Sequence, residues 1–140
     1  MKNLRYILMI VAVLAFASTG SFAGTLKVIA NPTVSANAVS SGDLQSVFLL
    51  DKDSLGGSHV EPVLARGGPA HDAFLKEYIG KDDPALHAYY RSLVFTCKGL
   101  MPKFFDTDAE VVAYVARTKG AVGYVSNGAS TAGVKVLSVK

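Results

Sequence analysis

The chain has 140 residues, enough for one domain with a substantial hydrophobic core. Its 14 basic residues exceed its 11 acidic residues by only three, and no run of Lys or Arg indicates binding to nucleic acid or to a membrane surface. A single cysteine, Cys97, excludes an internal disulfide.

The N-terminal residues have the pattern of a secretory signal peptide. A basic start (residues 2–5) precedes an apolar run (6–17), and Ser21-Phe22-Ala23 places small residues at the two positions that signal peptidase inspects. The apolar run is too short to span a bilayer comfortably, which disfavours the alternative of a membrane anchor. We therefore expect cleavage after the last of these residues, giving a signal peptide (1–23) and one mature domain (24–140). The mature protein is expected in the periplasm, without stable membrane insertion.

The first half of the mature domain is predicted to alternate strands and helices. A short strand (25–30) is followed by a polar loop and by a helix that begins near Ser41 and carries an apolar face. A second strand (60–65) ends at a Gly-Gly-Pro turn, and a helix over about 70–79 ends at Gly80.

The second half is predicted to contain two further helices and two strands. A helix that begins at Asp83 carries a broad apolar stripe as far as Cys97, which predicts a buried, unreactive thiol; the alternative is a reactive or dimer-forming thiol. The capping box at 107–110 begins another helix, and strands follow at 121–125 and 134–139. Strands joined by helical crossovers predict an α/β fold with a partly parallel sheet.

The mature sequence lacks the usual catalytic signatures. It has no G-x-S-x-G, no phosphate-loop motif, no H-E-x-x-H and no C-x-x-C. Asp83 and His87 have a spacing that could hold a metal, but two ligands make a poor site, and a solvated helix face is the simpler interpretation. We therefore expect no enzyme activity, no metal and no cofactor.

Two loops that lead from a strand into a helix are candidate anion sites, because unpaired N–H groups at a helix start favour negative charge. The first loop offers hydroxyls that include Ser35. In the second, Arg66 can make a forked contact to an oxyanion, and Gly67 and Gly68 allow close approach to the backbone. His71 can add a donor when it is protonated. The alternative for the second loop is a simple Gly-Gly-Pro turn.

Four short segments, in chain order, carry a family pattern: Asp43–Leu49 (DLQSVFL), Glu61–Arg66 (EPVLAR), Phe95–Pro102 (FTCKGLMP) and Gly120–Val125 (GAVGYV). Their order and spacing resemble motifs of the phosphate-type periplasmic substrate-binding proteins of ABC transporters, particularly short, single-lobe relatives. The matching motifs are D-L-x-x-I-F-L, x-P-V-x-R, F-x-G-x-G-x-x-P and G-A-I-G-Y-V. In the third, Cys97 replaces a glycine.

The resemblance implies one lobe of a type II periplasmic-binding-protein fold, with a mixed, mostly parallel sheet flanked by helices. It also implies binding of phosphate or a similar small oxyanion, and an ABC permease as partner. Full-length members bind phosphate between two lobes with a Ser-Gly-Thr cradle, whereas the equivalent stretch here, 67–71, has no hydroxyl. The alternative is a non-catalytic envelope accessory or protein-interaction module that has lost ligand binding, which an exposed apolar patch would favour.

Overall fold

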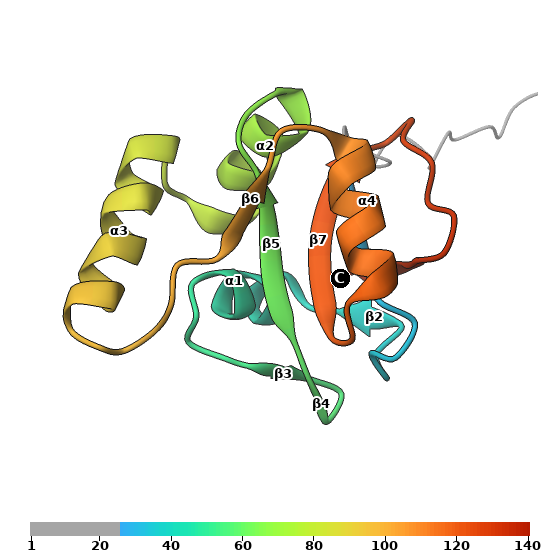
Figure 1. The fold of residues 1–140 in the computed structure, drawn as a ribbon, viewed down its shortest axis with the longest axis horizontal. Helices are drawn as coiled ribbons and strands as arrows, with labels where there is room; N and C mark the ends of the chain where they lie inside the picture. Colours follow the sequence, from blue (N-terminus) through green and yellow to red (C-terminus); the bar gives the residue numbers. More distant parts are fainter. Residues whose placement is uncertain (1–25) are drawn as a thin grey trace, which may run out of the picture.

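The computed structural model describes residues 26–140, and the predicted signal peptide lies outside them. At its centre is a six-stranded sheet in the order β2-β8-β1-β7-β5-β6 (Figure 1). The strands are β1 (Leu26–Ala30), β2 (Ala38–Val39), β5 (Glu61–Ala65), β6 (Lys103–Phe105), β7 (Ala121–Ser126) and β8 (Lys135–Val139). A separate small hairpin pairs β3 (Ser54–Leu55) with β4 (Ser58–His59).

The sheet is mixed, and three of its five neighbouring pairs are parallel: β2–β8, β5–β6 and β5–β7. Strand β1 runs antiparallel to both β7 and β8. The predicted fold class, an α/β layer with a mostly parallel sheet, is therefore confirmed. The short strands β2, β3, β4 and β6 were not predicted, because two or three residues carry too little periodicity to be recognised.

The helices are α1 (Ser41–Phe48), α2 (Pro69–Phe74), which continues as the π-helical turn η3 (Leu75–Ile79), α3 (Asp83–Phe95) and α4 (Asp108–Arg117). Helix α4 covers one face of the sheet, α1 and α2 lie on the other, and α3 lies beyond the β6 edge (Figure 1). Side chains of Ser40, Asp82 and Thr107 accept hydrogen bonds from backbone N–H groups at the starts of α1, α3 and α4. Within residues 26–140, no helix is both long and apolar enough to cross a bilayer.

Alternate residues of the central strands supply two hydrophobic cores, one on each face of the sheet. Val28, Leu64 and Tyr124 face α1, α2 and α3, whereas Ile29 and Val63 face α4. All five are buried. Because both faces are covered, the loops at the strand ends are the open parts of this architecture.

The far end of α3 differs from the predicted buried stripe. The helix ends at Phe95, and Cys97 follows with φ 56° in an exposed position. Leu86 and Tyr90 are buried, but Val94 is 43% and Phe95 83% exposed. The prediction of a buried Cys97 is therefore wrong, because this end of α3 extends beyond the sheet, where no second layer covers it (Figure 1).

Candidate functional site

The candidate site lies where β5 ends and α2 begins, at the end of the sheet where β5, β6 and β7 all terminate (Figure 1). The backbone N–H of Arg66 donates to the carbonyl of Phe105 at 2.9 Å, which ties the loop to β6. The Arg66 side chain is 64% exposed, and its Nε lies 3.4 Å from Asp106 Oδ1. An exposed pair of this kind contributes only about 0–1 kcal/mol, so an anion in solution can compete for the guanidinium.

The two glycines of the predicted site form an open turn. Gly67 and Gly68 are exposed, and a Cβ on either would meet no atom within 4 Å. Gly68 has φ 100°, a conformation that residues with side chains rarely adopt, and it directly precedes Pro69 at the start of α2. Gly68 is thus required by the turn, and the space above both residues leaves their backbone accessible.

His71 lies inside the protein rather than at the surface. It is 1% exposed, its Nδ1 is hydrogen-bonded to the hydroxyl of Tyr124, and its Nε2 lies 2.7 Å from Asp83 Oδ1. Because both ring nitrogens already have partners, the expectation that His71 donates to a ligand does not fit this arrangement. The side chain instead connects the start of α2 to β7 and to α3. These contacts hold the loop after β5 in position from the interior of the protein.

The hydroxyl of Tyr124 completes this buried chain of hydrogen bonds. It accepts from the backbone N–H of Ala65 at 3.2 Å, which leaves its proton for His71 Nδ1. Burial raises the pKa of Tyr124 far above its ordinary value, so the hydroxyl keeps this proton at neutral pH. A His71 ring that accepts this proton at Nδ1 carries its own proton on Nε2 and donates it to Asp83.

Ser35 lies at the opposite end of the sheet from Arg66. Because β1 is antiparallel to β7 and β5 is parallel to it, the chain leaves β1 and β5 at opposite ends. The hydroxyl oxygens of Ser35 and Ser58 are 2.7 Å apart, beside the β3–β4 hairpin. The structure therefore brings Gly67 and Gly68 to Arg66, but not Ser35.

A pocket of 360 Å³ opens beside Arg66 and is lined also by His87, Met101, Pro102 and Phe104. The His87 ring stacks on Phe104 with 4.8 Å between centroids. Its Nε2 lies 3.5 Å from the same Asp83 oxygen that contacts His71. The sequence analysis did not identify the residues that line this pocket beside Arg66, because β6, which carries Phe104, is only three residues long.

Asp83 joins two histidines, but the group does not form a metal centre. Across the described residues, no cluster of three or more His, Cys, Asp or Glu side chains could hold a metal ion. His87 shares Asp83 with the buried His71 and packs against an aromatic ring. The i, i+4 pair of Asp83 and His87 therefore orients side chains around the pocket.

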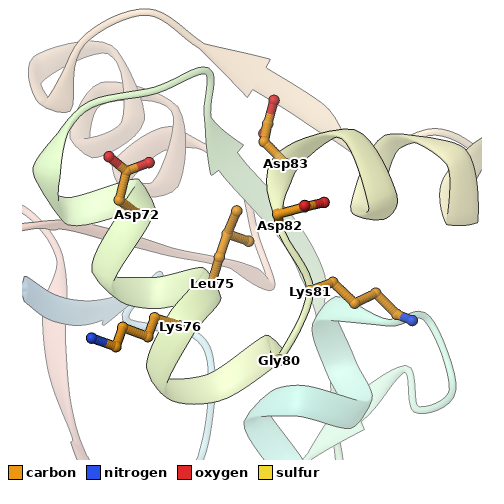
Figure 2. Close-up of a pocket in the computed structure, with 7 residues that line it drawn as sticks. All are labelled: Asp72, Leu75, Lys76, Gly80, Lys81, Asp82 and Asp83. Atoms are coloured by element: carbon orange, nitrogen blue, oxygen red, sulfur yellow. The ribbon is translucent and has the colours of Figure 1, made fainter.

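A second pocket, of 430 Å³, lies between η3 and the start of α3 (Figure 2). Three carboxylates line it, from Asp72, Asp82 and Asp83, and Leu75 lies between them. The side chains of the two lining lysines extend away from it in opposite directions (Figure 2). This concentration of negative charge makes the pocket unsuited to an anion.

The sheet order, the helices on its two faces and the loop after β5 define one lobe of a periplasmic-binding-protein fold. The fold is similar to that of a Clostridium perfringens protein, solved with bound phosphate and described as a phosphate ABC transporter substrate-binding protein. The two superpose with a TM-score of 0.66 at 16% identity, over 82% of this chain and 44% of the Clostridium protein. PstS from Borrelia burgdorferi gives 0.63 at 14% identity over 83% and 47%. An ABC-type phosphate transport receptor from Vibrio cholerae gives 0.55 at 12% over 82% and 46%.

These likenesses confirm, at the level of the fold, the resemblance inferred from the motifs. The chain spans less than half the length of each of these proteins, which fits a single lobe. No protein-family model matches the sequence, and no curated protein matches it significantly. At 12–16% identity, the ligands of these proteins do not transfer to this chain by similarity alone.

Proposed function

We propose that this chain is an exported, single-lobe solute-binding protein that binds a small anion at Arg66 and works with an ABC permease in the periplasm. The observation that carries the proposal is the exposed guanidinium of Arg66 at the carboxyl end of β5, beside a pocket. In open α/β sheets, ligands bind at the carboxyl ends of strands. The fold is shared with proteins named for phosphate binding or transport.

The proposed binding is weak. One lobe leaves the opposite side of the ligand in water, where charged contacts are screened by salt. The ion pair with Asp106 also competes with the ligand for Arg66. We expect a dissociation constant between about 1 µM and 1 mM, equivalent to roughly −8 to −4 kcal/mol.

The test is an isothermal titration of the mature protein with small anions at low and moderate salt. Arg66→Ala should weaken binding about tenfold, the lower end of the range for a charged hydrogen bond because the side chain is exposed. Asp106→Asn should strengthen binding, since it removes the competing carboxylate. Arg91→Ala, which removes an exposed arginine on α3, is the matched control and should change nothing. Anion binding that is equal in wild type and Arg66→Ala would exclude this site.

A second candidate function, a non-catalytic protein-interaction module, is favoured by one feature of the surface. Four of the five large apolar side chains exposed in the described part of the chain gather at the end of α3 and in the following loop: Val94, Phe95, Leu100 and Met101. Phe95 and Leu100 are 83% and 85% exposed. Exposed apolar side chains grouped in this way often mark a contact site.

The two functions predict different results for one pair of variants. If the apolar surface contacts a protein, Phe95→Ser and Leu100→Ser should abolish that contact and leave anion binding intact. Self-association through this surface would appear as a dimer in light scattering of the wild type that both variants reduce to a monomer. A wild-type monomer that binds no envelope protein would count against this second function.

A further inference from the structure

We propose that the anion bound at Arg66 is an organic monoanion, such as a carboxylate attached to an apolar, planar group, rather than inorganic phosphate. The inference rests on the proposed function, because it assigns the chemical class of ligand for the same site. It is carried by the pocket beside Arg66, whose walls combine one fixed positive charge with a mainly apolar surface.

The size of this pocket fits more than a single tetrahedral ion. Its 360 Å³ falls at the lower end of the range of about 300–1,000 Å³ that is typical of small-molecule sites. An oxyanion at Arg66 would fill only part of this volume, and the space beside Met101, Pro102 and Phe104 would remain open to a further part of the ligand.

The apolar wall is held in place by the fold. Phe104 is half-buried, stacked on His87 at 4.8 Å and in an edge contact with Tyr90 at 6.3 Å between centroids. Met101 is 41% exposed, and its flexible thioether can adapt to a ligand. A hydrocarbon or aromatic group placed here would lose contact with water, which favours binding in proportion to the apolar area buried.

The charges around Arg66 favour one negative charge over two. Asp106 lies 3.4 Å from the Arg66 Nε, so a dianion would approach a carboxylate as well as the guanidinium. The nearby cation Lys103 is directed elsewhere, with its Nζ 4.9 Å from the ring centre of Tyr114 on α4. A carboxylate, in contrast, matches the planar fork of one guanidinium with one charge.

The donors needed for a tetrahedral oxyanion are also few. The loop from Gly67 to His71 has no hydroxyl, and His71 is occupied by Tyr124 and Asp83. Four phosphate oxygens would then depend on Arg66, the exposed backbone N–H groups of Gly67 and Gly68, and water, whereas the two oxygens of a carboxylate can both be bound by the guanidinium.

The two larger pockets of the described structure do not compete for this class of ligand. The pocket between η3 and α3 is acidic, as described above. A larger pocket of 610 Å³, between α4 and the loop after β7, has Asp108 and no basic residue in its lining. The pocket at Arg66 thus combines a cation with an apolar wall.

The experiment is an NMR titration of the mature protein at neutral pH with four probes: benzoate, acetate, inorganic phosphate and uncharged benzamide. Benzoate should bind about tenfold more tightly than acetate or phosphate, and benzamide should not bind measurably. Arg66→Ala should weaken benzoate and acetate alike. Met101→Ala should weaken benzoate severalfold without affecting acetate, and Phe104→Leu, which keeps the apolar packing, provides a second test of the wall. Leu100→Ala, a neighbouring exposed residue outside the lining, is the control.

The results separate this inference from the proposed function. If phosphate or acetate binds in an Arg66-dependent manner but benzoate is no tighter, the organic-anion inference is overturned and the anion-binding function stands. If Arg66→Ala changes the binding of none of the anions, both the organic-anion inference and the proposed anion-binding function are overturned. Tighter benzoate binding that Met101→Ala and Phe104→Leu leave unchanged would place the aromatic group elsewhere and would also overturn the inference.

Discussion

The hydroxyl of Tyr124 offers a direct test of the hydrogen-bond chain behind the candidate site. It accepts from the Ala65 N–H at 3.2 Å and is hydrogen-bonded to His71 Nδ1. Ala65 directly precedes the Arg66 loop and His71 follows it. Tyr124→Phe removes only this oxygen. The ring would keep its stacking on Phe74, where the centroids are 4.0 Å apart and the planes differ by 12°.

The expected cost follows from the two polar groups that lose their partner. Tyr124 and His71 are buried, at 0% and 1% exposure, and the Ala65 amide is buried with them. Leaving a buried donor or acceptor unsatisfied costs about 1–3 kcal/mol, so two such groups predict a loss of about 2–6 kcal/mol. Small domains are typically stable by about 5–15 kcal/mol, so the variant should still fold over most of this range.

Urea unfolding of residues 24–140, the predicted mature domain, measures this change. With a denaturant slope of about 2 kcal/mol per M, the midpoint of Tyr124→Phe should fall by about 1–3 M while the slope stays the same. Tyr78→Phe is the matched control, because Tyr78 is half-buried and its hydroxyl has no hydrogen-bond partner among the described residues; its midpoint should barely move. Equal midpoints for wild type and Tyr124→Phe would refute the proposed role of this hydroxyl in holding the loop.

Two further predictions concern packing and the thiol. A Cβ on Gly123 would lie 2.9 Å from Val63 Cγ2 and 3.0 Å from Val111 Cγ1, so Gly123→Ala should cost about 1–3 kcal/mol in urea unfolding. Gly42→Ala, in helix α1 with no atom within 4 Å of the new methyl, should be neutral or slightly stabilising, and a similar loss in both variants would contradict this reasoning. Cys97 is exposed, so a thiol reagent should label the native protein completely, at nearly the same rate as in denaturant. Slow labelling of the native protein that accelerates on unfolding would show that Cys97 is buried and would contradict this prediction.

Much of the fold could be predicted because its signals are local. The Thr107 hydroxyl accepts from the N–H of Glu110, as the capping box indicates, and Gly80 ends η3 with φ 76°. Strands β5 and β7 were recognised from short apolar runs bounded by turn residues. Each of these features depends on residues within a few positions of one another, so the sequence carries them without reference to the rest of the chain.

The candidate site was only partly predictable. Arg66 and the Gly67-Gly68 turn lie side by side in the sequence, and the structure keeps them together at the end of β5. Phe104, in contrast, reaches the pocket through the short pairing of β6 with β5, in which Leu64 is its partner. A three-residue strand has no periodicity of its own, so its position depends on the partner strand.

By itself, the sequence determined the class of fold, the main helices and strands, and the loop that carries Arg66. The tertiary structure alone decided the direction of β1, which takes Ser35 to the opposite end of the sheet, and the burial of His71 between Tyr124 and Asp83. It also left the end of α3 uncovered, with Cys97 exposed. The physical reason is the range of the interactions: caps and periodicity are set by near neighbours, whereas strand direction and burial depend on contacts such as His71–Tyr124, which are 53 residues apart in the chain.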